Sequence, residues 1–252
     1  MLLKESPISK TLRNLKSRGF HAVFAPDRDK ARDRILKLIP LHSTIGVGDS
    51  TSLYQIEVIP ELEARGNHIV HPFRSNIHPP NSLYSMETTL RKSLDQDFFI
   101  TGANVVTEDG RIISVDGVGN RIAGMIFGAK KVILVLGQNK IVKDLVSAFG
   151  RIEKVISPGH AKHRGFETPC VQKGECVDCR VKERICNVIA ILEGRPMMTD
   201  ITVILVGEDL GLGWDPDWPH GRIEKIWNNY VAKCWCPDLE KVMNRKRRRD
   251  GT

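Results

Sequence analysis

The sequence predicts an α/β fold, a mostly parallel sheet with helices on both of its faces. Strand-like and helical patterns alternate along most of the 252 residues, which is typical of such sheets. Two runs, KVILVL at 131–136 and ITVILV at 201–206, are almost entirely apolar, as expected for central parallel strands covered on both faces. A hydrophobic content of 41% provides enough apolar side chains for a substantial core.

The first hundred residues alternate between helical periodicity and short apolar runs. Apolar residues recur at helical spacing from Ile8 to Leu15, and Gly19 ends that helix. Ser50 is placed to cap a helix that Gly66 ends. The expected helices are 4–18, 27–39, 50–65 and 82–94, and the expected strands are 21–25, 43–47, 68–73 and 98–103.

The second half begins with a predicted hairpin. Two β-rich runs, 104–107 and 111–115, are separated by Glu108-Asp109-Gly110, and Asp-Gly between such runs is a strong hairpin signal. Residues 157–187 are polar, contain cysteines and show no periodicity, so we expect a Cys-bearing insertion loop there. The remaining expected helices are 121–127, 143–156 and 221–233, and the remaining expected strands are 131–136 and 201–206.

The formal net charge of +8 is concentrated at the two ends of the chain. Residues 1–40 carry +6 and residues 241–252 carry +5, which leaves −3 for the residues between them. A nucleic-acid-binding domain carries its positive charge on the folded surface, so we expect no nucleic-acid partner. We expect one α/β domain over residues 1–240 and a basic, disordered tail at 241–252.

The apolar runs are short throughout the chain. None approaches the ~18 residues that a membrane-spanning helix needs, and the first residues lack the apolar stretch of a secretory signal. We therefore expect a cytoplasmic protein without a membrane partner.

A glycine-rich turn, Gly46-Val47-Gly48-Asp49-Ser50-Thr51, follows a predicted strand and opens a predicted helix. Glycine allows close approach of the backbone to a ligand, and a helix N-terminus offers free N–H groups to an anion. The pattern is neither the dinucleotide fingerprint nor a P-loop, so no nucleotide is expected. Gly46, Gly48, Asp49 and Ser50 are candidate ligand-binding residues, and an ordinary capped turn is the alternative.

A second group of glycine turns lies between residues 101 and 121. The loop containing Gly117 and Gly119 opens a helix, and Asn120 and Arg121 lie at its start, so these four residues are candidates for binding phosphate or carboxylate. Ligands bind beyond the carboxyl ends of strands in open α/β sheets. Glu108 is a candidate base or nucleophile, although a solvated hairpin tip is the alternative.

Several stretches resemble the LUD-domain proteins, the lactate-utilisation domain family, and specifically a four-cysteine subgroup of stand-alone members. They are GVGDSTSL at 46–53, TGANVVTEDGRIISVDGVGNRIAGMIFGAKKVILVLG at 101–137, TPCVQKGECVDCRVKERICNVIAILE at 168–193 and GEDLGLGWDPDWP at 207–219. The resemblance implies a three-layer fold related to ribose-5-phosphate isomerase and the CoA-transferases, with its site at glycine-rich loops.

The same resemblance implies roles for particular residues. Glu108 is similar to the catalytic glutamate of related CoA-transferase turns, and Asn104 stands where the sugar-phosphate isomerases have an acid, so it would orient the substrate. An enzyme would then have isomerase-like or CoA-transferase-like chemistry on an anionic small molecule. The lactate-utilisation name itself states no reaction.

Four cysteines lie within seventeen residues: Cys170, Cys176, Cys179 and Cys186. Clustered thiolates with one C-x-x-C pair suit tetrahedral zinc or an iron–sulfur cluster, and the nearby positive charges favour thiolate over thiol. Redox switching and inert thiols are the alternatives. His160 and His163 could substitute as ligands or could be surface-loop histidines.

Two functions remain open at this stage. The first is an enzyme of lactate or organic-acid metabolism that binds a small anionic metabolite. The second is a non-catalytic iron–sulfur or zinc-binding subunit with an oxidoreductase partner. A metal at the cysteines would favour the second function.

Overall fold

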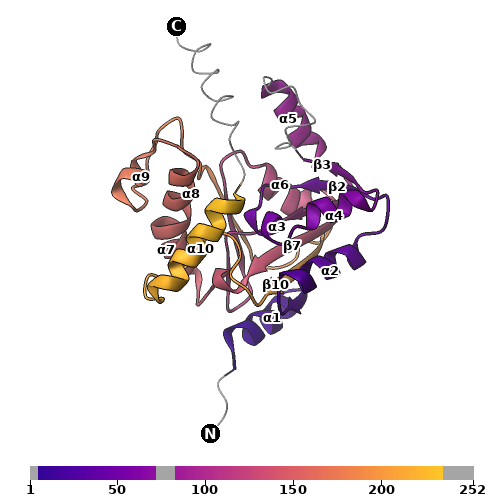
Figure 1. Cartoon of the computed structure of the whole chain (residues 1–252), viewed down its shortest axis with the longest axis horizontal. Coiled ribbons are helices and arrows are strands. Elements are labelled where there is room, and N and C mark those ends of the chain that lie inside the picture. Colours follow the sequence, from indigo (N-terminus) through magenta and orange to yellow (C-terminus); the bar gives the residue numbers. More distant parts are fainter. Residues whose placement is uncertain (1–4, 72–82, 235–252) are drawn as a thin grey trace.

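The computed structural model describes residues 5–71 and 83–234, and its centre is a six-stranded sheet (Figure 1). Every neighbouring pair of strands in this sheet is parallel, which confirms the predicted α/β fold. The strands in spatial order are β1 (His21–Ala25), β10 (Asp200–Val206), β7 (Lys131–Gly137), β4 (Phe98–Thr101), β2 (Thr44–Val47) and β3 (His68–Val70).

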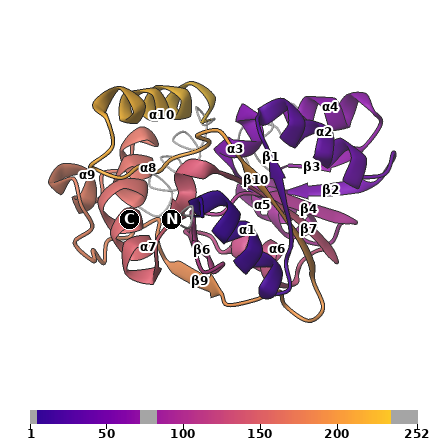
Figure 2. The same ribbon diagram turned by 90° about the horizontal axis from the view of Figure 1, so that it is seen from below.

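Helices cover both faces of this sheet (Figure 2). One face packs against α2 (Arg28–Leu38), α3 (Thr51–Gln55) and α4 (Val58–Ala64), and the other against α1 (Pro7–Ser17) and α6 (Asn120–Phe127). Alternate residues of β7 serve the two faces: Ile133 and Val135 join the first apolar cluster, and Val132 and Leu134 join the second. The apolar run is therefore a strand buried on both sides. The helix α5 (Leu83–Lys92) precedes β4.

A second, smaller sheet extends the fold. Its strands in spatial order are β8 (Ile141–Val142), β5 (Val105–Thr107), β6 (Ile112–Asp116) and β9 (Val188–Leu192). The antiparallel pairing of β5 with β6 confirms the hairpin that Asp109-Gly110 predicts. The sequence analysis assigns no element to residues 188–192, because this continuous apolar run follows the irregular cysteine segment. In the structure β9 pairs with the whole of β6.

Two predicted helices have different limits in the structure. The expected helix 50–65 is divided into α3 and α4, because Glu57 adopts a left-handed conformation with φ of 55°. The expected helix 143–156 begins as α7 (Leu145–Arg151) and continues without a break through a π-helical turn (Ile152–Ile156) into α8 (Ser157–His163).

The predicted irregular loop is consequently shorter than residues 157–187. Its start belongs to α8, and α9 (Pro169–Lys173) follows, which leaves 174–187 without helix or strand. The last described helix is α10 (His220–Lys233), close to its predicted limits. No helix within residues 5–71 and 83–234 is long and apolar enough to span a membrane. The predicted basic tail, 241–252, lies outside the described residues.

Gly46 in β2 is required for packing. A Cβ atom on Gly46 would overlap the backbone carbonyl oxygen of Ser93 and would lie 3.1 Å from the Phe99 ring. A backbone oxygen cannot move aside as a flexible side chain can. The structure therefore explains this glycine by close contact between β2 and the end of α5, without a ligand.

Replacing Gly46 by alanine should lower the free energy of unfolding by about 1–3 kcal/mol, since the added methyl group overpacks a buried strand. Gly150→Ala is the matched control, because no heavy atom outside its own helix backbone lies within 4 Å of a Cβ there. Alanine in that helix should be neutral or stabilising by at most about 1 kcal/mol. Urea unfolding of both variants measures the difference, and equal effects would contradict this explanation.

Candidate functional site

The glycine turns that follow the strands converge on a cavity of about 360 Å³. The turns after β2, β4 and β6 form part of its wall, and α8, the cysteine segment and α10 form the rest. Its polar and charged lining side chains include Asp49, Ser50, Asn104, Asp116, Asn120, Arg121, Lys140, His160, Arg164, Lys182, Glu183, Arg184 and Tyr230. This position beyond the carboxyl ends of parallel strands is where open α/β sheets bind ligands.

Six of the predicted site residues line this cavity, and three predicted glycines do not. Asp49, Ser50, Asn104, Gly117, Asn120 and Arg121 belong to the wall. Gly46, Gly48 and Gly119 have structural explanations. Gly48 leaves room for Arg121, whose Cγ would lie 3.0 Å from a Cβ atom at that position. Gly119 has φ of 92° where α6 begins, a conformation that favours glycine.

The start of α6 differs from the predicted anion site. The carboxylate of Asp116 accepts hydrogen bonds from the backbone N–H groups of Arg121 at 3.0 Å and Ile122 at 3.1 Å. An internal carboxylate therefore occupies the N-terminus of this helix and caps it. The Arg121 side chain, and not the helix backbone, is what α6 offers to an anion.

Arg121 is held in place by the second sheet. Its Nη2 donates to Asn104 Oδ1 at 3.2 Å and also to the carbonyl oxygen of Val115. Asn104 Oδ1 accepts a further hydrogen bond from the Val115 N–H at 2.9 Å. The oxygen of Asn104 is thus already used, and its side-chain amide is the part that can donate to a ligand.

Asp49 and Arg164 both line the cavity and form an ion pair with each other. Their closest side-chain atoms, Oδ2 and Nη2, lie 3.5 Å apart, and the Arg164 side chain is only 8% exposed. Burial raises the pKa of Asp49, although the charges of Arg164 and Arg121 act in the opposite direction. Tyr54 also donates to Asp49, at 3.4 Å. Asp49 is therefore a buried carboxyl group with a pKa above its ordinary value, beside a cation that it pairs with.

Lys140 is a buried cation that the sequence analysis did not single out. Its Nζ donates to the carbonyl oxygen of Ala103 at 2.7 Å, and the residue is 7% exposed. Burial, with a smaller contribution from the charge of Arg121, lowers the pKa of Lys140 from 10.5 to about 7. It follows β7 within a short 3₁₀ turn, Gln138–Lys140. The sequence could have indicated Lys140 as a site residue, because it lies just after a clearly predicted central strand, where such sheets bind ligands.

His160 lies on α8 and faces the cavity. Its Nδ1 is 2.5 Å from the hydroxyl oxygen of Tyr230 on α10. Burial first, and then the charges of Arg164 and Arg121, lower the pKa of His160 to about 3, so the ring is neutral at physiological pH. The structure therefore excludes a surface-loop role for His160. The His163 ring packs on the Tyr230 and Trp227 rings, at centroid distances of 5.3 and 6.3 Å.

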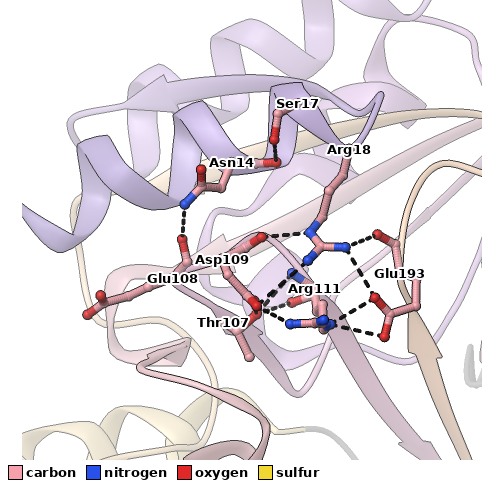
Figure 3. A network of polar contacts seen from close by, with 8 residues as sticks. All are labelled: Asn14, Ser17, Arg18, Thr107, Glu108, Asp109, Arg111 and Glu193. Atoms are coloured by element: carbon pink, nitrogen blue, oxygen red, sulfur yellow. Dashed lines mark hydrogen bonds and ion pairs between the residues drawn. The ribbon is translucent and has the colours of Figure 1, made fainter.

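Glu108 lies away from this cavity. Its carboxylate pairs with Lys10 of α1 at 2.9 Å. Its carbonyl oxygen accepts a hydrogen bond from Asn14 Nδ2 at 2.7 Å (Figure 3). The structure does not bring Glu108 and Asn104 into one site, which corrects the predicted pairing of these two residues. Its neighbour Asp109 belongs to an ion-pair network with Arg18, Arg111 and Glu193 that fixes the hairpin to α1 and β9 (Figure 3).

Comparison with known proteins gives the family. The LUD domain family profile matches residues 8–206. The chain belongs to the LUD domain family. A DUF162 family protein from Deinococcus radiodurans is similar, with 18% identity over 81% of this chain and 100% of that chain and a TM-score of 0.44. A ribose 5-phosphate isomerase A from Methanocaldococcus jannaschii gives 17% identity over 47% and 55% of the two chains and a TM-score of 0.30. No curated protein matches.

The cysteine segment of this LUD domain lies beside the cavity. Residues 182–185, between Cys179 and Cys186, form part of the cavity wall. Burial raises the pKa of Cys186, and the charges of Cys176 and Cys179 raise it further, so these three thiols lie near one another. Cys170 is buried on α9, where its Sγ lies 3.1 Å from Thr168 Oγ1.

The thiols do not form a ready metal site. Among the described residues, no group of three or more histidine, cysteine, aspartate or glutamate side chains has the arrangement of metal ligands. The backbone N–H of Asp178 donates to Cys176 Sγ at 3.4 Å, which is a contact that stabilises a thiolate. The donor atoms suit zinc or an iron–sulfur cluster, but residues 174–187 would have to rearrange to bring four sulfur atoms together.

The buried Lys140 should make the stability of this LUD domain depend on pH. Between the pKa of about 7 in the folded state and the ordinary value of 10.5, the unfolded chain binds one more proton, so the free energy of unfolding rises with pH. The slope approaches ~1.4 kcal/mol per pH unit.

Lys140→Met removes this slope. Between pH ~7.5 and ~9.5 the wild-type protein should gain about 2 kcal/mol relative to the variant, as measured by urea unfolding. The exposed Lys143→Met is the control for loss of a lysine, and its curve should run parallel to that of the wild type. Parallel curves for Lys140→Met as well would show that the amine is not buried as described.

Proposed function

We propose that this LUD-domain protein binds a small anionic metabolite, an organic acid, in the cavity beside Arg121, Lys140 and Arg164. The observation that carries the proposal is the excess of positive charge around one cavity. Five basic and three acidic side chains are among the described residues that line it. Of the three acids, Asp49 is paired with Arg164, and burial raises its pKa. A bound anion would stabilise these cations, whose mutual repulsion is strong where water is excluded.

The cavity has groups suited to a carboxylate. Arg121 is oriented by Asn104 and by the Val115 carbonyl oxygen, so its fork-shaped guanidinium needs little ordering when a ligand binds. Lys140 uses one N–H for the Ala103 carbonyl oxygen and retains further donors. A volume of about 360 Å³ is within the range of sites for small molecules. The family name, lactate utilisation, favours organic acids as the class.

The geometry favours proton transfer over acyl transfer if the protein is an enzyme. Asp49 and Lys140 line one cavity, and burial moves the pKa of each toward neutrality. Pairs of groups displaced in this way serve as acid and base in many enzymes. Glu108 supports no CoA-transferase-like step, because its carboxylate pairs with Lys10 outside the cavity. We therefore propose isomerase-like chemistry as the catalytic alternative to simple binding.

Isothermal titration calorimetry with lactate, pyruvate and inorganic phosphate tests the proposal. At least one anion should bind, and Arg121→Gln should weaken its binding about 10-fold to 100-fold, because a charge-assisted hydrogen bond is worth about 1.5–3 kcal/mol. Arg13→Gln is the control, since Arg13 is exposed on α1 and pairs with Glu5. Thermal melting verifies that both variants are folded. Equal loss in both variants, or no binding of any anion, would overturn the proposal.

A second candidate function is metal binding by the cysteine segment. The observations that favour it are the proximity of Cys176, Cys179 and Cys186 and the N–H donated to Cys176. Four thiolates would hold zinc structurally or carry an iron–sulfur cluster that serves an oxidoreductase partner. In either case a metal would order residues 182–185, which belong to the cavity wall.

Metal analysis and a visible spectrum of protein purified without oxygen test this candidate. An iron–sulfur cluster gives brown protein with broad visible absorbance, whereas zinc gives colourless protein with one metal ion per chain. The double variant Cys176→Ser/Cys179→Ser should lose the metal, and Cys234→Ser, outside the segment, should retain it. Metal-free wild-type protein from both aerobic and anaerobic preparations would eliminate the candidate.

A further inference from the structure

Lys140 is a buried cation of the cavity that pairs with no carboxylate among the described residues, unlike two of the arginines. Arg164 pairs with Asp49, and Arg184 pairs with Asp178. In the part of the chain that the structure describes, the only hydrogen bond of the Lys140 amine goes to the Ala103 carbonyl oxygen. A buried lysine without an anionic partner is costly to the fold when charged. The neutral amine is the form that this environment favours.

The loop that follows β10, the strand beside β7 in the sheet, lies against this amine. The side chain of Asn139 donates to the Gly213 carbonyl oxygen at 2.9 Å and accepts from the Leu210 N–H at 2.9 Å. The Gly211 N–H donates to Gln55 Oε1 at 2.6 Å. These contacts fix the loop and the 3₁₀ turn relative to each other, so the position of Lys140 is defined by three separate segments.

Gly211 provides the space for the amine. A Cβ atom at this position would lie 2.9 Å from Lys140 Nζ, and Gly211 has φ of 69°, a conformation that glycine adopts without strain. This glycine belongs to the GEDLGLGW stretch that the sequence analysis noted without assigning it a role. The loop is thus shaped around a lysine side chain of the wall of a metabolite-sized cavity.

Such an amine is suited to covalent chemistry. A lysine that only attracts an anion must keep its charge, and exposure to water favours the charged form. Burial instead makes the unprotonated, nucleophilic amine accessible at neutral pH, and lysines of this kind react with carbonyl groups. The positive charge of Arg121 helps to lower the pKa of Lys140. The two side chains also contact one turn: Arg121 donates to Asn104, and Lys140 donates to the carbonyl oxygen of Ala103.

We propose that Lys140 forms an imine with the carbonyl group of a small oxo acid whose carboxylate is held by Arg121 and Arg164. The Nζ lone pair attacks the carbonyl carbon to form a carbinolamine. Loss of the hydroxyl oxygen as water then leaves the carbon–nitrogen double bond, so no oxidant or reductant is consumed. Asp49 lines the same cavity and is the acid available to protonate the leaving hydroxyl group. This inference rests on the proposed function, because it requires an organic anion in the cavity.

Borohydride trapping tests the imine directly. The full chain is incubated with pyruvate or with glyoxylate at neutral pH and treated with sodium borohydride, which reduces an imine to a stable secondary amine. Mass spectrometry of the digested protein should find Lys140 heavier by one molecule of the oxo acid less one oxygen atom. Lys140→Arg should abolish that adduct, and Lys143→Arg, an exposed lysine three residues away, should retain it.

Calorimetry with the same acids, without borohydride, separates this inference from the proposed function. An adduct on other lysines, one that persists in Lys140→Arg, or binding of pyruvate or glyoxylate without any adduct would overturn the imine and leave anion binding intact. Binding of lactate or phosphate but of neither oxo acid would also overturn only the imine. If no anion binds and no adduct forms, both proposals fail.

Discussion

The site depends on one electrostatic constraint, which is the burial of the Lys140 amine within reach of the charge of Arg121, in a cavity that Arg164 also lines. Buried cations repel one another more strongly than cations in water. Of these three side chains, Arg164 pairs with Asp49, and the Lys140 amine donates to a carbonyl oxygen. The positive side chains at the cavity therefore repel one another, and a bound carboxylate would reduce this repulsion. Burial is also the first cause of the pKa shifts of Asp49, Lys140 and His160.

The fold produces this constraint through its parallel sheet. All strands of the main sheet run in the same direction, so the turns after β2, β4 and β7 meet at one edge. The second sheet positions Arg121 through the Val115 carbonyl oxygen. The long helical segment from α7 to α8 then carries His160 and Arg164 over that edge (Figure 1). Elements from distant parts of the chain thus bury the Lys140 amine and the His160 ring at the cavity wall.

Much of the fold could be predicted from the sequence, because local patterns determine it. The apolar runs at 131–136 and 201–206 became β7 and β10, and Asp109-Gly110 became a hairpin turn. The break at Glu57 could not be predicted, since a left-handed glutamate has no local sequence signal.

The candidate site could be predicted only in part. Asn104 and Arg121 lie on glycine turns that the sequence shows, whereas Lys140 acquires its properties only through burial by residues 208–213. Glu108 was misplaced because its turn resembles a catalytic one, while Lys10 and Asn14, about a hundred residues away, determine its surroundings.

The most direct measurement is a crystal structure of the protein grown with pyruvate and, separately, with lactate. The account predicts electron density for a carboxylate within hydrogen-bonding distance of Arg121 and Arg164, with the Lys140 amine facing the same ligand. A cavity that contains only water at saturating ligand, or a Lys140 side chain paired with a protein carboxylate, would contradict the claim that buried positive charge at Arg121 and Lys140 defines the site.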